Sequence, residues 1–98
     1  MTLDEIRTIT APVLRRHAVE FAAVFGSHAR GEAKANSDVD ILVRYAKPTG
    51  LGHVRLAYEL EDLLKKKVDL VTEKSVDKYI KSNVARDLQI IYGQRQQI

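Results

Sequence analysis

The sequence has 98 residues, with 16 Lys plus Arg against 13 Asp plus Glu, 45% apolar residues and no cysteine. A chain of this length has room for one hydrophobic core, so we predict a single domain over residues 1–98. The lack of cysteine excludes a disulfide framework, a thiolate metal site and a cysteine nucleophile. No apolar run approaches the roughly 20 residues of a membrane span, so we expect no membrane partner and a cytoplasmic location. The net charge of +3 is spread over both halves of the chain, which argues against direct nucleic-acid binding.

The first predicted element is a helix. Thr2 and Glu5 have the spacing of a capping box, and apolar residues recur at helical spacing from Leu3 to Leu14. Pro12 falls inside this pattern and lacks the N–H that would bond back by one turn. Either the helix kinks there or a second helix begins after Thr10, and the sequence leaves both open.

Strands and helices then alternate along the chain. Apolar runs rich in β-branched residues predict strands over residues 19–25, 39–45 and 68–72. Helical spacing predicts one helix over residues 51–64 and another from Ser75, and a short strand is expected over residues 89–92. The predicted fold class is therefore α+β, with helices around a small β-sheet.

Gly26 and Ser27 follow the first predicted strand directly. Gly26 lets the backbone approach a ligand closely and take conformations closed to other residues. Ser27 adds a hydroxyl, and a short helix beginning there would offer free N–H groups to a phosphate, a geometry that an ordinary helix cap shares. Gly31 would allow such a segment to end tightly.

Three carboxylates belong to the next two strands. Side chains alternate along a strand, so Asp38 and Asp40 point the same way and can reach one cation between them. Asp69 interrupts an apolar run, where we expect its charge to meet a cation or water, because an unpaired charge in a small sheet is costly. If the two strands are neighbours, the three carboxylates converge and predict a two-metal site for phosphoryl or nucleotidyl transfer. The plainer alternative is a polar strand start, with Asp69 facing solvent.

The basic side chains near these residues are less informative. Arg30 could bind phosphates, or it could be an ordinary surface arginine in a polar loop. We expect His28 to point to solvent and to have no catalytic role. His17 and His53 lie on helical patterns, which favours surface or partly buried positions over metal ligation.

The spacing of these residues resembles a known signature. Gly26-Ser27, ten intervening residues, Asp38-x-Asp40 and the later Asp69 resemble the nucleotidyltransferase superfamily that includes DNA polymerase β. The stretches 26–31 and 37–40 are more closely similar to the minimal nucleotidyltransferases, the MNT antitoxins encoded beside HEPN-family toxins. The resemblance covers nearly the whole chain. It implies a mixed sheet packed with helices, ATP and Mg²⁺ binding, and transfer of AMP to a tyrosine of the partner toxin, whose RNase activity is thereby silenced.

Each candidate residue has a role in this scheme. Asp38, Asp40 and Asp69 are the expected catalytic residues and ligands of two Mg²⁺ ions, while Gly26, Ser27 and Arg30 are expected at the nucleotide. Two alternatives stay open: an antitoxin that neutralises its toxin by binding alone, and an enzyme that modifies a small molecule or RNA. Because no substrate-binding domain is visible, we expect the acceptor to be a macromolecule with its own docking surface.

Overall fold

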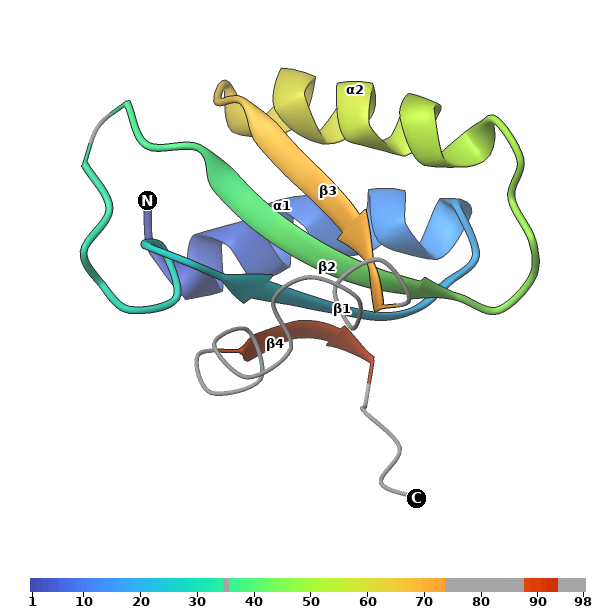
Figure 1. Cartoon of the computed structure of the whole chain (residues 1–98), viewed down its shortest axis with the longest axis horizontal. Coiled ribbons are helices and arrows are strands. Elements are labelled where there is room, and N and C mark those ends of the chain that lie inside the picture. Colours follow the sequence, from blue (N-terminus) through green and yellow to red (C-terminus); the bar gives the residue numbers. More distant parts are fainter. Residues whose placement is uncertain (35, 74–87, 94–98) are drawn as a thin grey trace.

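The computed structural model describes residues 1–34, 36–73 and 88–93 of the chain. These residues form a four-stranded sheet with two helices on one face (Figure 1). Neither helix of this described part is long and apolar enough to cross a membrane. In chain order the elements are α1 (Leu3–Arg16), β1 (Val19–Phe25), β2 (Val39–Tyr45), α2 (Gly52–Leu64), β3 (Val68–Thr72) and β4 (Gln89–Gly93).

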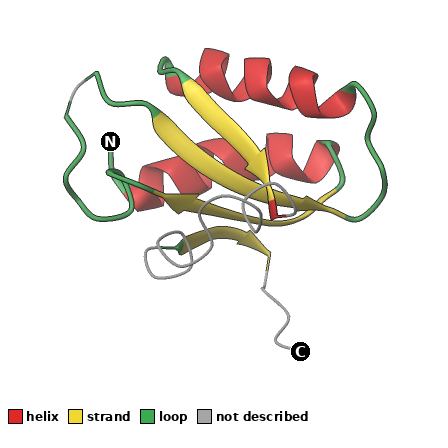
Figure 2. Cartoon of the chain, in the orientation of Figure 1, coloured by secondary structure: helices red, strands yellow, loops and turns green. Residues whose placement is uncertain are grey.

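The sheet is mixed, with strand order β3-β2-β1-β4. β1 runs antiparallel to both β2 and β4, whereas β3 is parallel to β2 and is reached through α2 (Figure 2). The predicted α+β class is confirmed, and the first three strands have the predicted bounds. β4 extends one residue further than predicted, to Gly93, and the helix predicted from Ser75 lies outside the described residues.

α1 is one helix that continues through Pro12. Its start has the predicted capping box, in which Glu5 N–H donates to Thr2 Oγ1 at 3.1 Å and Thr2 N–H donates to Glu5 Oε1 at 2.8 Å. Thr10 and Leu14, on either side of the proline, are both fully buried. Because burial holds both halves of the helix against the sheet, the missing N–H of the exposed proline does not divide it.

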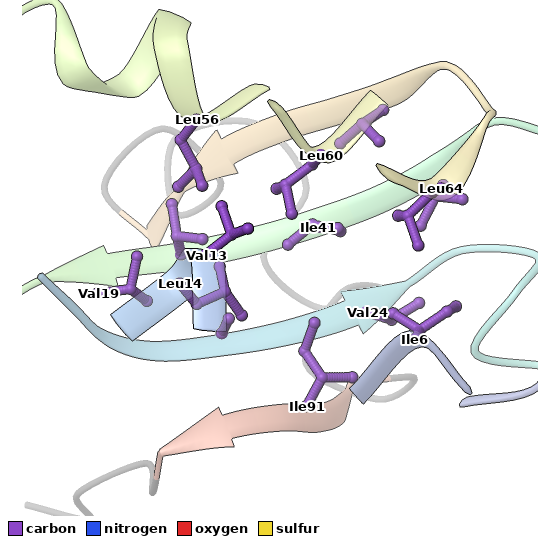
Figure 3. Close-up of a cluster of buried hydrophobic side chains, with 14 residues drawn as sticks. Ile6, Val13, Leu14, Val19, Val24, Ile41, Leu56, Leu60, Leu64 and Ile91 are labelled. Carbon is purple, nitrogen blue, oxygen red and sulfur yellow. The ribbon is translucent and has the colours of Figure 1, made fainter. Parts of the chain in front are cut away.

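The main core lies between the helices and one face of the sheet (Figure 3). Leu56, Leu60 and Leu64 recur every four residues and so form one buried stripe of α2. On β2, the odd-numbered residues face this core, as predicted. Alternation then places Asp40 on the opposite face, which these two helices leave uncovered. The labelled members of the core are Ile6, Val13, Leu14, Val19, Val24, Ile41, Leu56, Leu60, Leu64 and Ile91.

Helix side chains bind backbone groups of both edge strands. From α2, Glu61 Oε2 accepts the N–H of Val68 at 3.0 Å, and His53 Nε2 donates to the carbonyl oxygen of Leu70 at 3.1 Å. From α1, Arg7 Nε donates to a carbonyl oxygen of β4 at 3.0 Å. These contacts satisfy polar groups on β3 and β4 that a bare sheet edge would leave open.

Candidate active site

The three residues with predicted site carboxylates lie at the same end of the sheet. Asp40 of β2 is the register partner of Asp69 of β3, and on its other side it pairs with Phe25, the last residue of β1. Asp38 comes just before β2 and is exposed, as is Asp69, whereas Asp40 is half-buried. The expectation that the third strand lies beside the second is confirmed. Asp69 is exposed, so water reaches its carboxylate, as expected for a charged side chain in this apolar run.

Gly26 lies directly against the carboxylate of Asp40. Its φ is +74°, a left-handed conformation that favours glycine. A Cβ atom built at this position would overlap the Oδ2 atom of Asp40. Glycine is therefore needed here for two independent reasons, and the turn after β1 packs directly against the central carboxylate.

The segment after Gly26 forms consecutive turns rather than the short helix considered from sequence. The carbonyl oxygen of Gly26 accepts from the N–H groups of Ala29 and Arg30 at 3.1 and 3.2 Å. The segment ends at Gly31, whose φ is +73°, as the sequence suggested. The N–H of Ser27 donates to no acceptor in the part of the chain that the structure describes, so it is available to an anion.

His28 is a residue of this site that sequence reasoning missed. Only 8% of its surface is exposed, so the expectation that it points to solvent is wrong. Its Nε2 donates to the carbonyl oxygen of Ser37 at 3.4 Å, immediately before Asp38. His28 thus joins the turn to the segment that carries the first carboxylate. The position of His28 between Gly26 and Asp38 was visible in the sequence. That the segment around Ser37 folds back over its side chain was not.

Arg30 lies at the edge of the site. Its Nε donates to Glu32 Oε2 at 3.0 Å, and the side chain is partly exposed. Beside it is a pocket of about 620 Å³, lined by the turn, by the start of α1 with Arg7, and by Gln89 at the start of β4. The structure therefore places Arg30 in the turn that follows Gly26 and at the wall of a cavity that α1 and the start of β4 also line.

Like charges accumulate around Asp40. Partial burial raises the pKa of its carboxyl, and repulsion from Asp69 and then Asp38 raises it further, while the interactions with His28 and Arg30 lower it. A divalent cation would offset such repulsion, and carboxylate oxygens are ligands that Mg²⁺ prefers. Among the described residues, no three acidic or histidine side chains are gathered closely enough to hold an ion. The donor set of three carboxylates suits Mg²⁺ chemically.

A second pocket, of about 630 Å³, lies at the other end of β2 and contains none of the predicted site residues. One of its walls is formed by Tyr45 and His53. Burial raises the pKa of Tyr45 to about 12, so its hydroxyl keeps its proton and donates to Nδ1 of His53 at 2.7 Å. His53 is half-buried and fully hydrogen-bonded, which confirms that it has a structural position.

Comparison with known proteins agrees with this geometry. Residues 8–97 match the family described as "Polymerase beta, Nucleotidyltransferase". The chain belongs to this family. As a member it is a nucleotidyltransferase, and its fold is that of the minimal nucleotidyltransferases.

Individual relatives are similar over most of their length. Protein adenylyltransferase MntA of Thermococcus cleftensis is 41% identical over 93 residues, which cover 90% of this chain and 94% of MntA. A solved toxin–antitoxin complex with AMP-PNP contains a similar chain, with a TM-score of 0.74 and 26% identity, covering 97% of this chain and 76% of that one. The complex of tri-AMPylated Shewanella oneidensis HEPN toxin with MNT antitoxin matches at a TM-score of 0.72, covering 95% and 74%. Its identity of 22% shows the shared fold alone.

Proposed function

We propose that this chain transfers AMP from ATP to a tyrosine hydroxyl of a HEPN toxin and so neutralises the toxin. The observation that carries the proposal is the packing of the Gly26 turn against Asp40, with Asp69 in register beside it. This packing supports the binding of a nucleotide by the turn beside the acidic residues, an arrangement that nucleotidyl transfer requires. The names of two relatives, a protein adenylyltransferase and a toxin–antitoxin complex with AMP-PNP, support adenylyl transfer and a toxin partner.

In this proposal the turn binds the nucleotide and the acidic cluster binds Mg²⁺. The N–H and hydroxyl of Ser27 hold a phosphate group, with Arg30 at the adjoining pocket. Asp38, Asp40 and Asp69 would hold Mg²⁺, which supplies positive charge to the phosphate oxygens. The acceptor oxygen bonds to the α-phosphorus of ATP, and the bond from that phosphorus to the departing pyrophosphate breaks.

The acceptor hydroxyl must lose a proton as it attacks. Asp69 is the exposed carboxylate on the edge strand β3, so an acceptor from another protein can approach it without displacing the sheet. We assign to Asp69 the acceptance of this proton. We also propose that the protein acts in the cytoplasm. Its positive charge is not concentrated in one block of the sequence, and we therefore propose that it binds no nucleic acid directly.

Transfer can be measured directly. The chain is incubated with ATP, Mg²⁺ and the HEPN protein encoded beside it, and intact-mass spectrometry of the HEPN protein should show added AMP. Asp40→Asn should reduce the rate by at least about a hundredfold, since it removes the central carboxylate. Asp62→Asn is a matched control, because Asp62 is an exposed aspartate of α2 that pairs with Lys65 and has no role in the proposed site.

The same experiment separates the alternatives. No added AMP with the intact chain, under conditions in which the two proteins bind, would exclude the proposed transfer. Neutralisation of the toxin that survives the combined loss of Asp38 and Asp40 would indicate an antitoxin that acts by binding alone.

A further inference from the structure

The short segment that leads into β2 is held by hydrogen bonds on both sides of Asp38. Before it, the Oγ of Ser37 accepts the N–H of Lys34 at 2.8 Å, and the N–H of Ser37 donates to the carbonyl oxygen of Lys34 at 3.0 Å. After it, the N–H of Val39 donates to the carbonyl oxygen of Lys67 at 2.9 Å. The backbone of Asp38 is therefore fixed through its two neighbours.

The side chain of Asp38 has no such support. It is exposed, and no donor in the part of the chain that the structure describes makes a hydrogen bond to its carboxylate. A carboxylate without a donor of its own takes its position from the backbone that carries it. The contacts that fix residues 37–39 therefore also set where this carboxylate can reach.

His28 reaches this segment from the turn after β1. Its Nε2 donates to the carbonyl oxygen of Ser37 at 3.4 Å, across nine residues of sequence, and only 8% of its surface is exposed. With this bond, the N–H, the hydroxyl oxygen and the carbonyl oxygen of Ser37 all have partners. Residues 30–32, 34 and 36 of the intervening loop are exposed. A buried side chain of the turn therefore restrains the residue directly before Asp38.

We propose that His28 is a positioning residue, whose bond to Ser37 holds the backbone of Asp38 where its carboxylate binds Mg²⁺. This rests on the proposed function, in which the three carboxylates bind the ion. Without the bond, the carboxylate of Asp38 would sample more positions, and binding Mg²⁺ would cost more conformational entropy. His28 also directly follows Ser27, so it connects the phosphate-binding part of the proposed site to the metal-binding part.

Mg²⁺ binding can be measured on the folded chain alone, without ATP or acceptor, as a Kd from isothermal titration calorimetry. His28→Phe keeps a ring in the buried position but has no donor, and it should raise this Kd about tenfold. His28→Gln carries an amide N–H that can replace Nε2, and it should restore most of the affinity. His17→Phe is the control, because His17 is also a half-buried histidine and its Nε2 bonds to Glu59 of α2. It should leave the Kd unchanged.

Ser37→Ala tests the same segment from a second residue. It removes the hydroxyl that accepts the N–H of Lys34 and leaves the carbonyl oxygen that His28 binds. The Kd for Mg²⁺ should rise in this variant too. If His28→Phe does not fold, Ser37→Ala and His28→Gln still decide the question.

AMP transfer gives a second readout. At limiting Mg²⁺, His28→Phe should have a lower kcat than wild type, and its kcat should recover as Mg²⁺ is raised. The KM for the HEPN protein should stay at the wild-type value. Damage to the fold alone would lower the thermal midpoint without increasing the Mg²⁺ that activity requires.

Three results would overturn the inference. The first is an unchanged Kd for Mg²⁺ in both His28→Phe and Ser37→Ala, and the second is a wild-type chain that binds no Mg²⁺. The third is an equal effect of His28→Phe and His28→Gln, because both lack the charge that a histidine can carry, and the role would then be electrostatic. Failure of the proposed function looks different: the Kd shifts as expected in the variants, and the wild-type chain transfers no AMP.

Discussion

The two ends of β2 differ in how their charges are arranged. At the first end, Asp40 has the carboxylates of Asp38 and Asp69 as neighbours, and their repulsion contributes to its raised pKa. At the other end, Arg44 lies between two carboxylates of opposite charge to its own. One strand thus carries a cluster of like charges around Asp40 and, four residues further on at Arg44, a cluster of opposite charges; we call the second the balanced end.

At the balanced end, Arg44 shows how a charged side chain with a structural position is paired in this protein. Arg44 Nε is 3.4 Å from Glu20, and Nη1 is 3.6 Å from Glu73. Its guanidinium also lies over the ring of Phe21, 5.5 Å from the centroid. Some of these buried atoms lack a short hydrogen bond, yet each charge has a counter-charge. The repulsion at the acidic end opposes folding, and it fits the proposal that a ligand binds there.

The largest effect is expected where the turn meets the acidic cluster. Gly26→Ala requires a left-handed conformation that alanine disfavours, and its methyl group would displace the Asp40 carboxylate. AMP transfer should fall by about a hundredfold, equivalent to roughly 2.7 kcal/mol of barrier, measured as kcat. Gly31→Ala is the matched control, since Gly31 also has a positive φ but has nothing within 4 Å of a built Cβ. Equal loss of activity in both variants would contradict a specific role for the contact with Asp40.

Disturbing the balanced end should change stability and not chemistry. His53→Ala removes hydrogen bonds to Tyr45 and to the carbonyl oxygen of Leu70. We expect a loss of about 1–2 kcal/mol in the free energy of unfolding, measured by urea denaturation. Tyr45→Phe, which removes one of these bonds, should lose about half as much. The kcat for AMP transfer is measured for both variants at a temperature well below unfolding. A lower kcat in either variant would show that the two ends of β2 are coupled.

We expect Mg²⁺ to bind at the acidic end of the sheet and to stabilise the folded protein through that site. At a Mg²⁺ concentration about ten times its Kd, binding adds roughly 1.4 kcal/mol to the free energy of unfolding, and the thermal midpoint should rise by several degrees. EDTA should reverse the shift. Asp40→Asn should remove most of it, and Asp62→Asn should retain it. A shift that survives the loss of Asp40 would place the ion elsewhere.

The smallest effect concerns pH. Without metal, Asp40→Asn should raise the free energy of unfolding at pH 7 by about 0.5 kcal/mol, because it removes a repelled charge that solvent partly screens. The folded pKa of Asp40 lies above its ordinary value of 3.8, so the wild type gains stability as pH falls through the folded pKa. The difference between variant and wild type should therefore shrink on acidification and level off below about 3.8. A difference that grows with acid would contradict the raised pKa.

Much of this arrangement could be predicted from sequence. Strand bounds followed from apolar runs, and the carboxylate positions followed from alternation along β2 together with the lone aspartate of β3. Local patterns could not decide whether Pro12 divides α1, because burial on both sides of it is a property of the packed core. They also missed the burial of His28, because that depends on residues near Ser37 folding back over the turn. The ion pairs of Arg44 could not be predicted either, because they join β2 to Glu20 on β1 and to Glu73 just after β3.

The side chains that bind the edge strands also restrict how this protein can meet others. An open strand edge can recruit any extended chain through backbone hydrogen bonds, whatever its sequence. Here Glu61 and His53 occupy backbone groups of β3, and Arg7 occupies one of β4. Pairing by strand addition would first have to break these contacts. We therefore expect the proposed partner to be recognised through side chains, which can distinguish one protein from another where backbone pairing cannot.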